Sequence, residues 1–132
     1  MDRQHISCAL AYATLGLVLG IFMAASHDHG QMVTHAHIML LGFVLSFIYG
    51  VMHRLWLHNS RGALAILQFC LHQIGSLVLL VSLFLMYGKI LDAQLLEPLL
   101  ALSSITVLVG LILMIVLFLK NAPAQSAQHT EN

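Results

Sequence analysis

The chain has 132 residues, of which 60% are hydrophobic and only 8% are charged, and its formal net charge at neutral pH is zero. This composition leaves too little polar surface to cover a soluble globule of that length, so it excludes a soluble enzyme domain. The few basic residues form no patch suited to nucleic acid, and we expect no nucleic-acid partner.

Four apolar stretches follow one another along the chain, and each has the roughly 20 residues that a bilayer-spanning helix needs. They cover residues 6–26, 36–57, 63–87 and 95–119. The sequence therefore predicts an all-α fold, a bundle of four transmembrane helices over residues 1–120 that lies in the lipid bilayer. Residues 121–132 are polar and without periodicity, which predicts a disordered tail.

The basic residues indicate the orientation of this bundle. One side of the predicted topology carries Arg3, Arg54, Arg61 and Lys120, whereas the other carries a single basic residue, Lys89, beside Asp28, Asp92 and Glu97. By the positive-inside rule both termini should face the cytoplasm. The compactness of the chain favours a bacterial source, in which case we expect the inner membrane, with residues 26–34 as a periplasmic loop.

The first span contains Gly16 and Gly20 at a GxxxG spacing, which allows two helices to approach closely. It also contains Cys8, and the only other cysteine, Cys70, falls in the third span. Two isolated cysteines in separate spans predict no disulfide framework.

The loop after the first span is rich in histidine. It holds His27, Asp28 and His29, and His35 follows at the mouth of the second span. Nitrogen and oxygen donors of this kind suit zinc or copper, so these residues are an alternative metal site on the outer surface. Short histidine-rich loops also occur without a metal.

The second span carries histidines at both ends. His35 and His37 lie about 200° apart on a helix, so we expect them to face different directions. An imidazole inside the membrane is a functional-site hypothesis, because lipid offers it no hydrogen-bond partner. At the inner end, His53 and Arg54 are predicted to form a solvated positive cluster with His58.

The third span places His72 well inside the membrane. Gln68 and Gln73 could bind it in a purely structural polar knot, and the alternative is a ligand role. Gly75 shares a face with His72 and would leave room for a flat macrocycle. The fourth span is predicted to begin near residues 95–97, with Pro98 in its first turn, and to serve as scaffold.

Residues 34–50, with the sequence THAHIMLLGFVLSFIYG, resemble the second helix of haem-copper oxidase subunit I. In that family a Thr-Ala-His type segment presents an axial ligand to the low-spin haem, and the matching position here is His37. The element Leu71-His72 is similar to one in small four-helix proteins that resemble the same subunit. The resemblance implies a haem b-binding protein that transfers electrons, with His72 as the candidate second ligand.

The sequence also departs from that family. It has neither the several-histidine copper centre nor the histidine and tyrosine pair of a full oxidase, and it has four spans where the oxidase subunit has twelve. We therefore expect a component of a membrane oxidoreductase, served by a quinol or a redox protein, rather than a chain that reduces oxygen alone. Because the oxidase subunit is built of three four-helix arcs, the resemblance implies a homo-oligomer, with a trimer as the favoured form.

The different depths of His37 and His72 in the membrane leave the identity of the second haem ligand undecided. Counted from the inner turn, His37 and His72 differ in depth by about 15 Å at roughly 1.5 Å per residue, too much for one haem on straight helices. A distorted helix, a subunit interface, or ligation by His35, His27 or His29 would resolve this. The rival interpretations are a copper- or zinc-handling protein without haem and a structural or assembly subunit of an oxidase.

Overall fold

The computed structural model of this chain describes residues 1–57 and 62–121. The predicted disordered tail and His58 of the inner turn lie outside these residues, apart from Asn121. All regular structure in the described ranges is helical. The elements are α1 (Asp2–Ser26), α2 (Met32–His37), the π-helix η1 (Ile38–Leu45), α3 (Ser46–Leu55), α4 (Ala63–Tyr87) and α5 (Ala93–Lys120).

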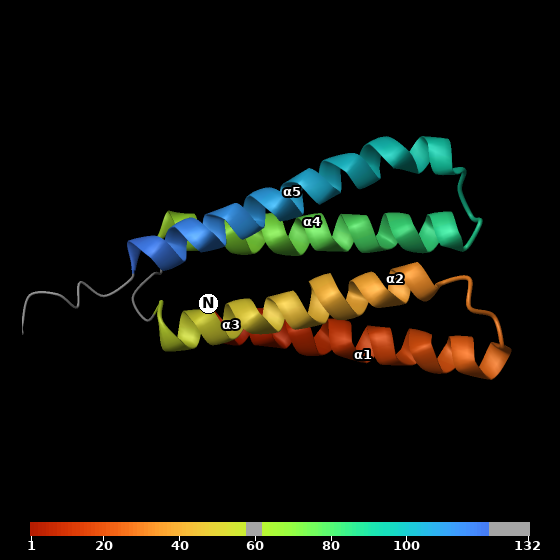
Figure 1. The fold of residues 1–132 in the computed structure, drawn as a ribbon, viewed down its shortest axis with the longest axis horizontal. Helices are drawn as coiled ribbons and strands as arrows, with labels where there is room; N and C mark the ends of the chain where they lie inside the picture. The colour runs from red at the N-terminus through yellow and green to blue at the C-terminus, as the bar shows by residue number, and fades with distance from the viewer. Residues whose placement is uncertain (58–61, 122–132) are drawn as a thin grey trace, which may run out of the picture.

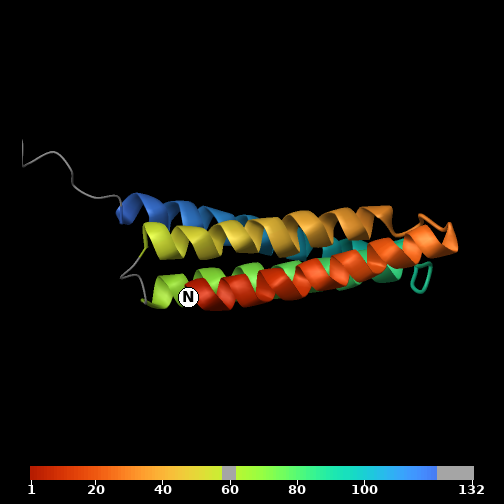
Figure 2. The ribbon, with the colours of Figure 1, turned by 90° about the horizontal axis from the view of Figure 1, so that it is seen from below.

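The described residues form four membrane-length helices that run side by side, as the two perpendicular views show (Figures 1 and 2). The segments α2, η1 and α3 continue into one another, and together they make the second span, Met32–Leu55. Length and composition suit all four helices to crossing a bilayer. The predicted multi-pass, all-helical membrane fold is therefore confirmed.

Large apolar side chains cover the outside of the bundle. Ile21 is 69% exposed and Leu102 is 63% exposed, and many leucines, isoleucines and valines on all four helices are similarly uncovered. Such a surface is unfavourable in water and matches hydrocarbon. The polar side chains that a soluble helix would place outside are instead gathered within the bundle.

The helices pack most closely as two hairpins, one made of α1 with the second span and the other of α4 with α5. Glycines make the first hairpin tight. A Cβ atom at Gly42 would lie 2.6 Å from the Tyr12 ring, and one at Gly16 would lie 2.5 Å from the Met39 sulfur. The predicted close approach at Gly16 is thus an approach of α1 to η1 within one chain.

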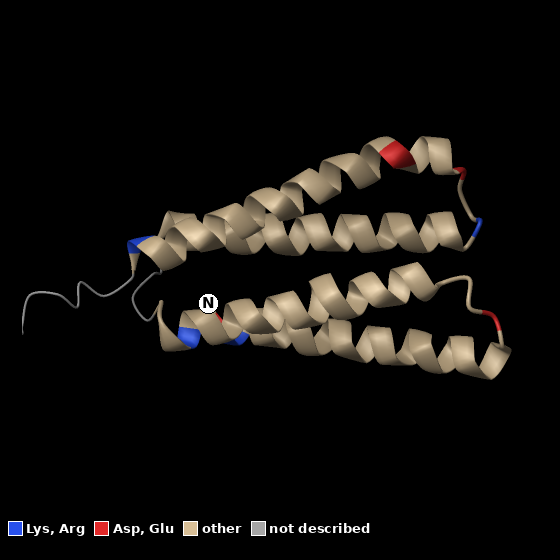
Figure 3. Ribbon diagram, viewed as in Figure 1, with Lys and Arg blue, Asp and Glu red and all other residues tan. Residues whose placement is uncertain are grey.

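Charged residues mark the two ends of the bundle (Figure 3). Arg3, Arg54 and Lys120 lie at one end, called the basic end here, together with the start of α1 and the end of α5. Lys89 lies at the opposite end, called the acidic end, with Asp28, Asp92 and Glu97. The arrangement matches the predicted partition of charge, and both described chain ends lie on the same side.

Several helix ends differ from those predicted. The first helix begins at Asp2 rather than at residue 6, and the second span begins at Met32 rather than at residue 36. The last helix begins at Ala93, so Pro98 lies beyond the first turn and removes one backbone N–H from the helix interior. The predicted helices were too short because polar residues interrupt the apolar stretches near the helix ends.

Candidate functional site

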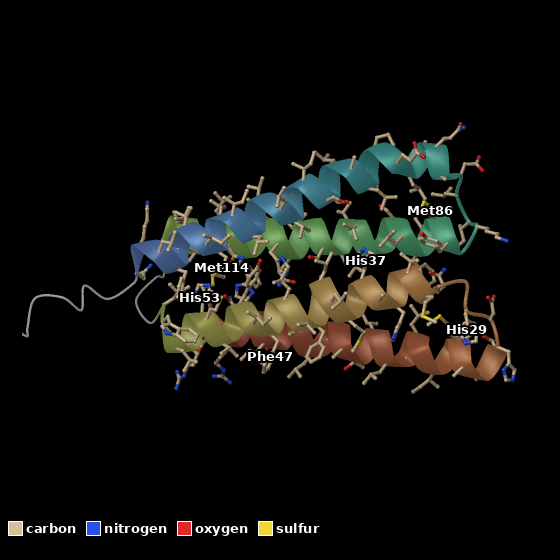
Figure 4. The ribbon with its side chains drawn as sticks, in the orientation of Figure 1. His29, His37, Phe47, His53, Met86 and Met114 are labelled. Carbon is tan, nitrogen blue, oxygen red and sulfur yellow. The ribbon has the colours of Figure 1, made fainter. Side chains whose placement is uncertain are left out.

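His37 ends α2 and lines a groove between the two hairpins (Figure 4). The groove has a volume of about 290 Å³ and a largely apolar wall. That wall is made by Leu41, Leu45, Leu79, Ser104, Val107, Leu108 and Leu111. Because α2, η1, α4 and α5 all contribute, the groove depends on how the two hairpins are placed together.

One hydrogen bond fixes the His37 ring. Its Nδ1 lies 2.8 Å from the carbonyl oxygen of Val33, one turn earlier. A carbonyl oxygen only accepts, so Nδ1 must carry the proton, and in the neutral ring Nε2 keeps its lone pair. No hydrogen bond in the described part of the chain involves Nε2. His37 is thus an oriented, half-buried imidazole with an available nitrogen.

His35 faces a different direction, as its spacing from His37 predicts. Its Nδ1 lies 2.9 Å from the carbonyl oxygen of Gly16, so the ring packs on α1. A Cβ atom at Gly20 would come within 3.1 Å of the ring, which is why glycine suits that position. His35 therefore belongs to the first hairpin and does not line the groove at His37.

The histidine-rich loop at the acidic end is open to its surroundings. His27, Asp28 and His29 are exposed, and Figure 4 shows His29 at that end, far along the bundle from His53. The Asp28 carboxylate accepts a 2.9 Å hydrogen bond from the Gly30 N–H. Across residues 1–57 and 62–121, no group of three or more His, Cys, Asp or Glu side chains is arranged to hold a metal ion.

His72 lies at a different level from His37. Its Nε2 is 3.0 Å from the hydroxyl of Ser46, and the side-chain amide of Gln73 donates to that hydroxyl at 3.2 Å. Ser46 follows His37 by nine residues on the second span, which is more than two helical turns. Within one chain, the structure therefore does not bring His37 and His72 to one haem.

Gly75 faces α5 rather than an open space. A Cβ atom there would lie 3.0 Å from Val107 and 3.1 Å from Thr106. The missing side chain lets α4 and α5 approach closely, so the room that Gly75 was predicted to leave for a macrocycle is taken up by α5 in this chain.

The most unusual feature of the molecule is a set of buried polar side chains toward the basic end, called the polar cluster here. Each member is at most 5% exposed. The members are His5, Ser46, Tyr49, His53, Gln68, His72 and Ser76. They come from α1, α3 and α4, where helical spacing puts Ser46, Tyr49 and His53 on one face and Gln68, His72 and Ser76 on another.

Ring contacts join the members of the polar cluster. His5 and His53 stack with ring centroids 5.3 Å apart, His5 lies 5.7 Å from Tyr49, and Tyr49 lies 4.8 Å from His72. Yet six of the seven members carry buried polar atoms without a well-formed hydrogen bond in the described part of the protein, and only weak contacts join His5 to Gln68 and His72 to the Leu41 backbone. Leaving such a group unsatisfied costs about 1–3 kcal/mol, so their concentration in one place makes the cluster a candidate site.

The polar cluster changes two sequence-based interpretations. His53 is 5% exposed and stacks on His5, so the prediction that it is solvated beside Arg54 is wrong. His5 was not among the candidate residues because it precedes the predicted first span. Its spacing to Ala9 and Tyr12, both buried on the same face of α1, is the pattern that would have identified it.

A second groove lies between α1 and α4. Its inner part, about 280 Å³, is apolar and reaches from Tyr12 to Phe84. Its outer part, about 630 Å³, shares Val18, Leu19 and Phe84 with the inner part and opens at the acidic end beside Asp28 and Lys89. An apolar channel with a polar mouth has the form of a site for an amphiphile.

Comparison with protein-family models, with curated proteins and with solved structures finds no match. The likeness of residues 34–50 to haem-copper oxidase subunit I therefore stays a prediction from the sequence.

Proposed function

We propose that this chain binds haem b within the membrane and transfers electrons, with Nε2 of His37 as one axial ligand of the iron. The observation that carries this proposal is the 2.8 Å hydrogen bond between His37 Nδ1 and the Val33 carbonyl oxygen. Histidines that bind metals commonly donate their other ring N–H in this way, because the bond fixes both the tautomer and the ring orientation.

The walls of the groove suit the face of a porphyrin, since leucine and valine side chains exclude water and lower the local dielectric. The haem would supply one-electron redox chemistry when bound. Small-molecule sites generally measure roughly 300–1,000 Å³, and the groove of about 290 Å³ is slightly smaller than that range. One chain therefore covers only part of a macrocycle.

The second axial ligand has to come from elsewhere. His37 is the only histidine of the described residues that lines the groove, because His35 packs on α1 and His72 binds Ser46. We therefore include in the proposal a homo-oligomer, with the trimer suggested by the resemblance, in which a second copy closes the open side and completes the haem site.

The charge distribution supports an orientation for this assembly. The positive-inside rule places the basic end in the cytoplasm, and the groove at His37 then lies nearer the periplasmic side of a bacterial inner membrane. The groove between α1 and α4 opens on that side beside Asp28 and Lys89. Its shape favours a quinol as electron partner, with a redox protein at the same surface as the alternative. The chain would then be one component of a membrane oxidoreductase.

Two other functions remain as alternatives. A copper- or zinc-handling role would use the exposed His27, Asp28 and His29 with His35, but His35 already bonds to Gly16 and lies against α1. A structural or assembly role in an oxidase would use the buried histidines only to join helices. Neither alternative accounts for the free Nε2 of His37.

The test is a reduced-minus-oxidised absorption spectrum of the protein purified in detergent from haem-replete cells. We expect sharp haem b bands, their loss in His37→Ala, and their retention in the matched variant His29→Ala, which alters an exposed histidine. A colourless, iron-free preparation would refute the proposal. Copper or zinc without haem bands would support the metal-handling alternative, and the absence of all three would support the structural one.

A further inference from the structure

The polar cluster is independent of the groove at His37 and carries an energetic cost of its own. Its orphaned polar atoms belong to His5, Tyr49, His53, Gln68, His72 and Ser76. A purely apolar bundle would have avoided the cost of burying them. In folded proteins, groups of this kind are satisfied by bound water where side chains are lacking.

The rings of the cluster form one continuous row. Adjacent ring centroids along His53, His5, Tyr49 and His72 are separated by 5.3, 5.7 and 4.8 Å, which are the distances of rings in direct contact. Bound water would therefore lie along the polar edges of the rings, where one water can join two polar atoms up to about 5.5 Å apart. Gln68 lies beside His5 and offers both a donor and an acceptor.

The cluster extends from the basic end of the bundle toward the middle of the membrane. His53 adjoins Arg54, whose side chain is exposed and lies 3.7 Å from the Asp2 carboxylate at the basic end. His72 is the tenth residue of α4, counted from Ala63 at the same end. At about 1.5 Å per residue this places it about 15 Å deep, near the middle of a hydrocarbon core of about 30 Å.

We propose that the polar cluster holds a chain of bound water molecules that gives protons from the basic end access to His72 at mid-membrane. Each step is balanced: an excess proton joins the lone pair of one group, and a different proton leaves that group for the next water. Neutral imidazole, the phenol and the hydroxyls can each accept a proton on one lone pair and release another, and the Gln68 amide takes part by hydrogen-bonding the waters. No oxidant, metal or bound haem is needed.

Two structural observations favour water over other occupants. The histidines of the cluster are not arranged to hold a metal ion, since the described residues contain no such group. The free atoms differ in kind, with imidazole nitrogens, a phenol, an amide and a hydroxyl, and water satisfies all of them because it both donates and accepts. A dry polar knot is the outcome against which the proposal is tested.

The experiment is solid-state NMR of the full chain in lipid bilayers, with ¹⁵N-labelled histidine and each ring assigned by substitution. We expect magnetisation to pass from water to the His72 ring, and the ring N–H to exchange with deuterium within minutes of adding D₂O. A His72 ring that receives no magnetisation from water and stays protonated for hours would overturn the proposal, whether or not the protein binds haem.

Matched variants test the path. Tyr49→Phe removes a hydroxyl between His5 and His72, and we expect it to slow deuterium exchange at His72 about five- to tenfold, the effect of one lost hydrogen bond. Tyr12→Phe alters another buried tyrosine on the His5 face of α1, outside the polar cluster. It should leave the exchange rate unchanged.

Equal exchange rates in Tyr49→Phe and in the parent would mean that water reaches His72 by another route, and this would also overturn the proposed path. Circular dichroism of each variant checks that the helical fold is retained. If Tyr49→Phe fails to fold, the double variant His5→Phe, His53→Phe at the entrance replaces it, with the same slowing expected.

Discussion

The two halves of this bundle place their histidines in different environments. Near the acidic end, His37 is half-buried, bonded through one nitrogen to Val33 and free at the other, on the wall of an apolar groove. Toward the basic end, His5, His53 and His72 are buried among polar neighbours. Burial therefore does not single out His37; what distinguishes it is an Nδ1 bonded to a backbone carbonyl together with an unbonded Nε2 on the wall of a groove.

The largest expected effect is the difference in haem content between a variant of the first region and a variant of the second. His37→Ala should reduce haem content to the background, whereas His72→Ala should retain haem because His72 does not line the groove and its Nε2 lies 3.0 Å from the Ser46 hydroxyl. Haem per protein, measured on purified variants by absorption, checks this difference. Loss of haem in His72→Ala with retention in His37→Ala would reverse the ligand assignment.

The next effect concerns the packing that positions His37. Gly42→Ala places a methyl group 2.6 Å from the Tyr12 ring, so α1 and η1 must separate. We expect a loss of about 1–3 kcal/mol in the free energy of unfolding, measured by denaturation in mixed micelles.

Gly62→Ala is the matched control for this substitution, since a Cβ atom there meets nothing within 4 Å in the described structure. Equal stability of the Gly42 and Gly62 variants would contradict the close packing of the first hairpin. A loss of haem in Gly42→Ala alone would show that this packing also shapes the groove.

In the other region, Ser46 is the residue that joins two spans. Ser46→Ala removes the hydrogen bonds to His72 and Gln73 and leaves a buried imidazole nitrogen unsatisfied. The expected loss is about 1–2 kcal/mol in unfolding free energy. Ser7→Ala, at an exposed position of α1, should be neutral, and a similarly small change in Ser46→Ala would argue that these bonds are not formed.

The sequence predicted the four spans because apolar runs of about 20 residues are rarely found outside bilayer-spanning helices. It also predicted that His35 and His37 face apart, which rests only on helical spacing. It did not predict the π-helical segment Ile38–Leu45, in which Gly42 packs against Tyr12 of α1. The burial of His5 and of His53 was not predicted, because a polar residue near a span end has the same local pattern whether it is solvated or buried.

The smallest effect should come from the only exposed side-chain ion pair among the described residues. Arg54 lies 3.7 Å from Asp2, and its side chain is 74% exposed. Pairs of this kind contribute little because water and salt screen them. Arg54→Gln should therefore leave the denaturation midpoint close to that of the parent protein, and closer still at high salt. A marked loss of stability would mean that this pair closes the entrance to the polar cluster, and that His5 and His53 depend on its charge.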